Sequence, residues 1–141
     1  MFDDIDQINW DEMRSGDAPQ WIKGLASDEE SVRTKSFYFL LSAYIHERPR
    51  FARAVVPYIL RILEQGEVNT ETEVLLGFLK DMRSSANGFI RHANDTIENA
   101  TRIIDDIDGS KDVFERLSDN PLTQEAALEL LSAIEDASDD S

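Results

Sequence analysis

The stretch from Ser27 to Ile45, SDEESVRTKSFYFLLSAYI, carries the clearest structural signal in the chain. It opens on Ser-Asp-Glu-Glu, the spacing of a capping box, in which Ser27 accepts from the backbone N–H of Glu30 and the Glu30 side chain reaches back. The apolar residues that follow cover most of the circumference of a helix, which therefore needs neighbours on more than one side. The stretch predicts a helix packed between other helices.

Two further stretches, Thr70 to Glu73 and Asp112 to Glu115, have the spacing of the same box. The three starts, at residues 27, 70 and 112, lie 43 and then 42 residues apart. A period in the low forties with two helices per unit is typical of HEAT and armadillo arrays, whose helix pairs bury their apolar faces against each other. We therefore expect an all-α, right-handed α-solenoid of about eight helices. One apolar residue keeps the same offset from each start: Val32, Leu75 and Leu117.

This period divides the chain into one domain over residues 1–137. Capping helices occupy residues 1–26, the repeat units occupy 27–69, 70–111 and 112–137, and the acidic tail 138–141 is expected to fray. The second unit includes apolar residues from Ala86 to Ile107 at alternating steps of four and three, which predict one long helix with its end at Gly109.

The apolar pattern also predicts helices at both ends of the chain and in its middle. A break is expected near Pro49, followed by a broad apolar stripe over residues 51–63 with a kink at Pro57. A short helix with Pro19 in its first turn is expected before the first box. The residues expected to face inward in the opening, second and last helices are Ile5, Ile8, Met13, Ile22, Leu25, Leu122, Leu128, Leu131 and Ile134.

Five stretches within residues 5–84 carry core and boundary residues in a familiar order. They are Ile8-Asn9-Trp10, WIKGLASDEESVR (21–33), Ile45-His46, AVVPYILRILE (54–64) and VLLGFLKDM (74–82). Together they resemble the stand-alone HEAT-like repeat proteins of bacteria, over a little more than half of the chain. The resemblance implies a helical repeat fold and a non-enzymatic, protein-binding scaffold, and some small members of the family resemble immunity proteins that neutralise toxins.

Composition narrows the functional class. The 141 residues contain no cysteine, which excludes disulfides and thiolate metal sites. The net charge is −15, and residues 95–141 alone hold fourteen acids against three bases. Such a field repels nucleic acid and anionic lipid and favours a basic protein partner, although a solvated acidic face that only aids solubility would look the same. Because no signal-peptide or membrane-spanning apolar run is visible, we expect a cytoplasmic protein without membrane contact.

The stretch from Ile104 to Glu115, IDDIDGSKDVFE, resembles a calcium loop but fails as one. With Gly109 at the sixth loop position, Ile104 stands where the first carboxylate is required, and Lys111 occupies a position that is normally apolar. We interpret the stretch as a boundary between helices. No catalytic motif appears either, because His46 and His92 have no carboxylate or second histidine at ligand spacing, and we expect no enzyme activity, cofactor or metal.

Three features are candidate partner-binding surfaces. Arg50, Arg53 and Arg61 form an arginine stripe that suits an acidic segment, or else forms salt bridges within the protein. The acidic last third suits a basic partner through Asp105, Asp106, Asp108 and Asp112, together with Asp136 and Asp139. Tyr38, in the run Phe37-Tyr38-Phe39, is the aromatic residue expected to reach the surface.

These observations favour a non-catalytic protein-interaction module. Its most specific form is an immunity-type inhibitor that binds a basic toxin or effector. One alternative is an acidic mimic of nucleic acid that inhibits a DNA-binding protein, and another is a small scaffold or regulatory subunit. An enzyme or small-ligand site built from distant residues and a homodimer formed through the helix of residues 86–107 also remain open.

Overall fold

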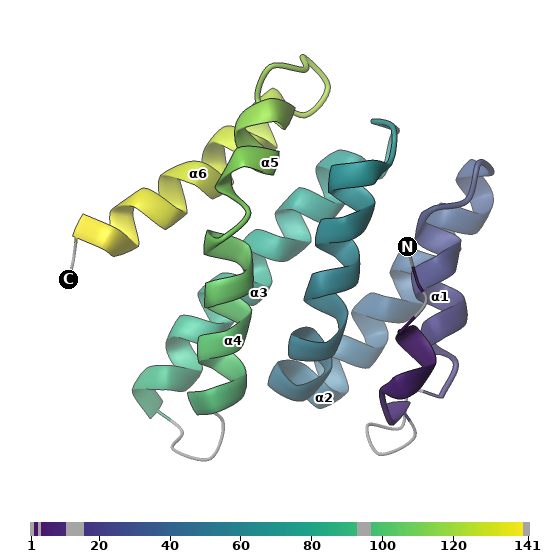
Figure 1. Ribbon diagram of the computed structural model, residues 1–141, viewed down its shortest axis with the longest axis horizontal. Coiled ribbons are helices and arrows are strands. Elements are labelled where there is room, and N and C mark those ends of the chain that lie inside the picture. The colour runs from purple at the N-terminus through teal and green to yellow at the C-terminus, as the bar shows by residue number, and fades with distance from the viewer. Residues whose placement is uncertain (1, 3, 11–15, 93–96, 140–141) are drawn as a thin grey trace. The chain divides into compact units, whose positions relative to one another are not determined.

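The computed structural model describes residues 2, 4–10, 16–92 and 97–139. Its elements are the 3₁₀ helix η1 (Ile5–Gln7) and six α-helices: α1 (Ala18–Leu25), α2 (Glu30–Gln65), α3 (Thr72–His92), α4 (Ile97–Asp108), α5 (Lys111–Leu117) and α6 (Gln124–Asp139) (Figure 1). Since every element in this part of the chain is helical, the all-α prediction is confirmed. The chain divides into two compact units, Met1–Gly66 and Glu67–Ser141.

In the first unit, α1 packs against α2. Pro19 lies in the first turn of α1, as predicted, and Ile22 and Leu25 are buried. The two helices approach closely at Gly24, where a Cβ atom would overlap the Ser36 hydroxyl. Val32 lies on the same side of α2, with its Cγ1 atom 3.6 Å from that Cβ position, and is 37% exposed.

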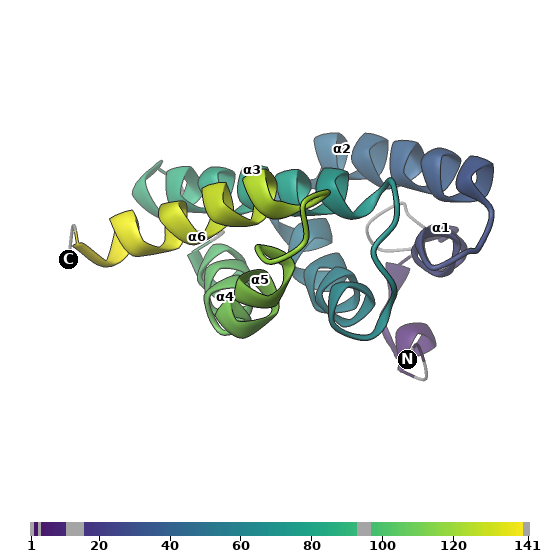
Figure 2. The same ribbon diagram turned by 90° about the horizontal axis from the view of Figure 1, so that it is seen from above.

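Helix α2 differs from the prediction of two helices separated near Pro49. It is one continuous helix of 36 residues, and its axis changes direction in the middle (Figures 1 and 2). Proline lacks the backbone N–H that an intact helix uses at this point, so Pro49 supplies a reason for the bend without ending the helix. The side chains of residues 46–49 lie outside the described part.

The second half of α2 forms the core of the first unit together with the start of the chain. Ile5 and Trp10 are buried, and the Trp10 indole N–H donates to the Ile5 carbonyl oxygen at 2.9 Å. The Trp10 ring meets Phe51 edge to face, with centroids 6.0 Å apart. Within residues 4–9 the helical part is η1, and Met13 lies outside the described residues. The buried side chains of this half of α2 include Phe51, Val55, Val56, Ile59 and Leu63.

In the second unit, α4 runs antiparallel to α3, α6 contacts α3, and α5 contacts α6 (Figure 1). The prediction of one long helix from Ala86 to Ile107 is wrong, since α3 ends at His92 and α4 begins at Ile97. The apolar residues form two facing surfaces instead of one seam. The residues that α3, α4 and α6 bury include Leu75, Leu79, Met82, Ala86, Ala100, Ile103, Ile107, Ala127, Leu130 and Ile134.

The inward-facing residues of α4 and α6 agree only in part with those expected, since Ala100, Ile107 and Ile134 are buried and others are not. Ile103 is 1% exposed, whereas the predicted Ile104 is only half-buried. Leu122 precedes α6 and is 68% exposed, and Leu128 is 50% exposed. Apolar residues occur on neighbouring faces of both helices, so their spacing permits more than one orientation, and packing against α3 selects one.

Two of the three predicted capping boxes are present in modified form, and the third is replaced by a different helix start. At the first, Ser27 Oγ accepts from the backbone N–H of Glu29 instead of Glu30. At the second, the reciprocal pair lies one residue earlier, since Asn69 Oδ1 accepts from the Glu71 N–H while Thr72 Oγ1 accepts from the Asn69 N–H, both at 2.9 Å. At the third, α5 begins at Lys111, so Asp112 lies inside the helix and caps nothing.

Candidate protein-binding surfaces

Arg61, from the predicted arginine stripe, holds the carboxylate of Asp4 in a bidentate ion pair. Its Nη1 donates to Asp4 Oδ1 at 2.8 Å and its Nη2 donates to Oδ2 at 3.1 Å. The Tyr58 hydroxyl donates to the same Oδ1 at 3.2 Å, and the guanidinium lies 4.9 Å from the centroid of the Tyr58 ring. These contacts attach the start of the chain to α2.

The pKa values of Asp4 and of the adjacent Tyr58 are both shifted. The hydrogen bond from Arg61 lowers the pKa of Asp4 from 3.8 to about 2, because it stabilises the carboxylate. Burial raises the pKa of Tyr58, and the negative charge of Asp4 adds to that effect. The Asp4 carboxylate is therefore ionised at neutral pH.

The other two arginines of the stripe lie on the same helix. Arg50 is exposed and Arg53 is half-buried. Both have further interactions within the protein, as does Arg61. The internal salt bridge considered for the stripe is thus present at Arg61, while binding of an acidic partner through Arg50 and Arg53 stays a prediction.

The four aspartates of residues 105–112 have different environments. Asp105 and Asp112 are exposed. Asp106 pairs with Arg102 one turn away at 3.4 Å. Asp108 accepts from Arg83 Nε at 2.8 Å and from Arg83 Nη2 at 3.2 Å. Asp106 and Asp108 therefore already bind arginines within the protein, which matters for a surface meant to attract a basic partner.

The stretch that resembled a calcium loop is a helix boundary, as predicted. Helix α4 continues to Asp108, and α5 starts at Lys111 after a connection of two residues. The Gly109 N–H donates to the Asp105 carbonyl oxygen at 2.9 Å, which closes the last turn of α4. A twelve-residue calcium loop would require this helical backbone to be a loop.

The sequence reasoning missed Arg83, which is 4% exposed. Besides its two bonds to Asp108, its Nη1 donates to the carbonyl oxygen of Ala133 in α6 at 3.4 Å. Arg83 therefore links α3, α4 and α6 through one side chain. Its position could have signalled burial, because it follows the buried Leu79 by four residues and precedes the buried Ala86 by three.

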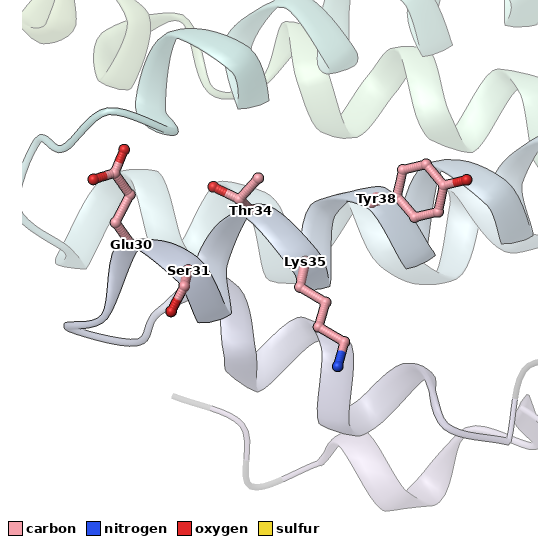
Figure 3. A pocket seen from close by; sticks show the side chains of 5 residues that line it. All are labelled: Glu30, Ser31, Thr34, Lys35 and Tyr38. Carbon is pink, nitrogen blue, oxygen red and sulfur yellow. The ribbon is translucent and has the colours of Figure 1, made fainter.

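Tyr38 reaches the surface, as expected. It is 65% exposed and borders a shallow surface depression of about 600 Å³ on the first half of α2. Figure 3 shows that all the lining side chains come from this one helix: Glu30, Ser31, Thr34, Lys35 and Tyr38. The depression has no second wall, so it suits contact with another macromolecule better than enclosure of a small molecule.

Other classes of site have little support in the described residues. No group of three or more His, Asp and Glu side chains there could hold a metal ion. The predictions about the side chains of His46, His92, Asp136 and Asp139 fall outside the described part. Within that part, no helix combines the length and the apolar character that crossing a membrane requires.

Comparison with known proteins yields no relative. No family model matches this chain, and neither a curated protein nor a solved structure matches it significantly. The likeness to HEAT-like repeat proteins therefore stays a prediction.

Proposed function

We propose that this protein is a non-catalytic protein-binding module whose partner presents a basic surface. The observation that carries the proposal is the charge exposed from α4 to α6. Among the described residues of this segment, eight carboxylates and three bases are exposed. The acids are Glu98, Asp105, Asp112, Glu115, Asp119, Glu125, Glu129 and Glu135, and the bases are Arg102, Lys111 and Arg116.

The charge of the chain is concentrated in the second unit. Residues 67–141 contain eighteen acids and six bases, a net charge of −12, whereas residues 1–66 contain eleven and eight, a net charge of −3. A field of one sign accelerates association with a partner of the opposite sign, and salt weakens this effect. We therefore place the proposed binding surface for the basic partner on the second unit.

The ion pairs of the second unit leave this surface negative. Arg83 pairs with Asp108, Lys80 lies 3.5 Å from Glu129, and Arg102 lies 3.4 Å from Asp106. At least three of the six bases therefore already have acidic partners within the protein. The net charge of −12 on residues 67–141 therefore favours an external partner that carries cations.

The finer form of the proposal is a HEAT-like array that acts as an immunity-type inhibitor of a basic toxin or effector. Its support is the packing of consecutive helices, α1 on α2 and α3 on α4, joined by short connections. A nucleic-acid mimic would need an uninterrupted track of carboxylates, and the exposed Arg102, Lys111 and Arg116 interrupt the acidic surface. They favour a protein scaffold over a mimic.

Affinity capture at low salt tests the proposal, with two full-length variants that carry the same change in charge. The first neutralises the proposed surface through Asp105→Asn, Asp112→Asn and Glu115→Gln. The control neutralises three exposed acids of the first unit through Asp6→Asn, Asp17→Asn and Glu64→Gln. Proteins captured from the native lysate are identified by mass spectrometry, and their association rates are measured at increasing salt.

The proposal expects a basic protein that the wild-type and control chains capture and that the surface variant loses. Its association rate should fall as salt rises, because screening weakens steering. Recovery of no protein partner at low salt, or equal capture by both variants, would contradict the proposal.

A further inference from the structure

Three aromatic side chains form a row that leads from α1 to the exposed face of α2. Trp21 and Phe39 stack with centroids 5.5 Å apart and ring planes 20° apart. Phe39 then meets Tyr38 edge to face, with centroids 6.1 Å apart. Trp21 and Phe39 are half-buried, while Tyr38 is 65% exposed. The supported ring of Tyr38 has few torsions to fix on binding, which is the property of an interface anchor.

The chemistry of this row favours a cation. Lys35 places its Nζ atom 5.9 Å from the centroid of the Phe39 ring, so the aromatic row already receives one ammonium group from the chain itself. The negative face of an aromatic ring attracts cations, and a guanidinium additionally stacks flat on the ring. Tyr38 offers a more exposed ring of the same kind than Phe39 does.

Acidic groups lie two helical turns before Tyr38. Glu30, Thr34 and Tyr38 follow one another along the helix in the depression drawn in Figure 3. Their spacing of four residues places Glu30 about 12 Å from Tyr38 along the axis. Asp28 and Glu29 are also exposed, so the end of the depression at Glu30 is strongly acidic.

We propose that Tyr38 anchors the basic partner by stacking on one of its arginine side chains, while Glu30 pairs with a second basic side chain about two helical turns away. This inference rests on the proposed function and adds a contact that selects arginine over lysine. The acidic surface of α4 to α6 cannot make this selection, because long-range attraction depends on charge and not on the shape of the cation.

A second copy of the chain suits this face poorly. Each copy carries a net charge of −15, so long-range repulsion opposes the approach of two copies. A basic partner instead complements Glu30 and the ring of Tyr38 together. Charge complementarity therefore favours a basic protein over a second copy of the chain at this face of α2.

Two matched peptides test the inference on the full-length protein. Both are alanine-based helices with two basic residues at positions i and i+7, about 10 Å apart; one carries arginine and the other lysine. Their dissociation constants are measured at low salt by NMR titration with wild-type, Tyr38→Ala and Tyr38→Phe chains. Leu122→Ala, at an apolar residue that is 68% exposed in the other unit, is the control.

The arginine peptide should bind wild-type protein roughly two- to five-fold more tightly than the lysine peptide, as expected for an exposed cation–π contact. Tyr38→Ala should abolish that preference, whereas Tyr38→Phe and Leu122→Ala should keep it, and the amide signals of residues 30–38 should shift. Equal affinity for the two peptides, or a preference that survives Tyr38→Ala, would overturn the inference. If shifts then appear on α4 to α6 alone, the proposed function stands without the anchor; if neither peptide binds at all, both are wrong.

Discussion

Each of the two compact units contains a bidentate arginine–aspartate pair, and the two pairs have nearly the same hydrogen-bond lengths. Arg61 binds through both Nη atoms, whereas Arg83 binds through Nε and Nη2. In the first unit Arg61 binds Asp4, and in the second Arg83 binds Asp108, with a shortest distance of 2.8 Å in both. The arginine side chains differ in burial, since Arg61 is 36% exposed and Arg83 is 5% exposed. Two ion pairs with the same shortest distance are therefore expected to contribute differently to stability.

The difference shows that burial decides what an ion pair does. Water can solvate Arg61 if Asp4 is removed. That pair positions the start of the chain, but its loss should lower the stability of the fold only slightly. Arg83 lies among the buried side chains of α3 and would keep an unpaired charge away from water if Asp108 were lost. The second pair is therefore a structural requirement of its unit.

The largest expected effect is that of Asp108→Ala. Removing one partner of a buried pair costs about 3–5 kcal/mol, and we expect about 3 kcal/mol because the Asp108 side chain is 32% exposed. Urea unfolding followed by circular dichroism measures the loss. Asp105→Ala, on the same helix and exposed, should change the free energy of unfolding by less than about 0.5 kcal/mol. Similar losses for the two variants would show that the buried pair has no special role.

Two glycines provide the next comparison between the units. A Cβ atom at Gly24 would overlap the side chain of Ser36, so Gly24→Ala should destabilise the protein by about 1–3 kcal/mol through overpacking. No described atom lies within 4 Å of a Cβ placed at Gly77 in α3, so Gly77→Ala should instead stabilise by up to about 1 kcal/mol. Thermal unfolding of both variants checks the opposite signs, and a stabilising Gly24→Ala would refute the close approach of α1 and α2.

The pair in the first unit should appear as a dependence of stability on pH. The pKa of Asp4 is about 2 in the folded protein and near 3.8 otherwise, so the stability from its ionised form is present above pH 4 and is lost as the pH falls to about 2. Melting temperatures of wild type and Asp4→Asn should therefore differ at pH 5 and converge near pH 2. Asp6→Asn, an exposed neighbour in η1, is the control, and parallel curves throughout would argue against the pair.

The smallest effect is expected at Lys80 and Glu129, which link α3 to α6 at the surface. Their charged atoms are 3.5 Å apart, and the side chains are 43% and 54% exposed. Exposed pairs contribute little, so Glu129→Gln should change the free energy of unfolding by less than about 0.5 kcal/mol. A loss as large as that for Asp108→Ala, measured in the same urea experiment, would show that exposure does not separate the two kinds of pair.

Local patterns in the sequence predicted the features that depend on neighbouring residues. The helical class, the first turn at Pro19, the end of α4 before Gly109 and the exposure of Tyr38 are all present in the structure. Each depends on a few consecutive residues, such as a proline with its fixed torsion or three aromatic residues in a row. Such features do not depend on contacts with distant parts of the chain.

Features that depend on a distant partner were not predictable in this way. The apolar residues from Ala86 to Ile107 suit one long helix as well as two helices that face each other, and their spacing is the same in both. The inward face of α4 was displaced from Ile104 to Ile103 for the same reason. The capping groups also moved by a residue, because several acidic and hydroxyl side chains compete at each helix start.

By itself the sequence determined that the chain is helical, where several of its helices begin and end, and that its negative charge lies mainly in the second unit. Only the tertiary structure decided which arginine is buried and which aspartate it binds. The physical reason is that propensity, capping and net charge act between near neighbours or over the whole chain. Burial and bidentate pairing instead require residues such as Asp4 and Arg61, 57 positions apart, to meet in space.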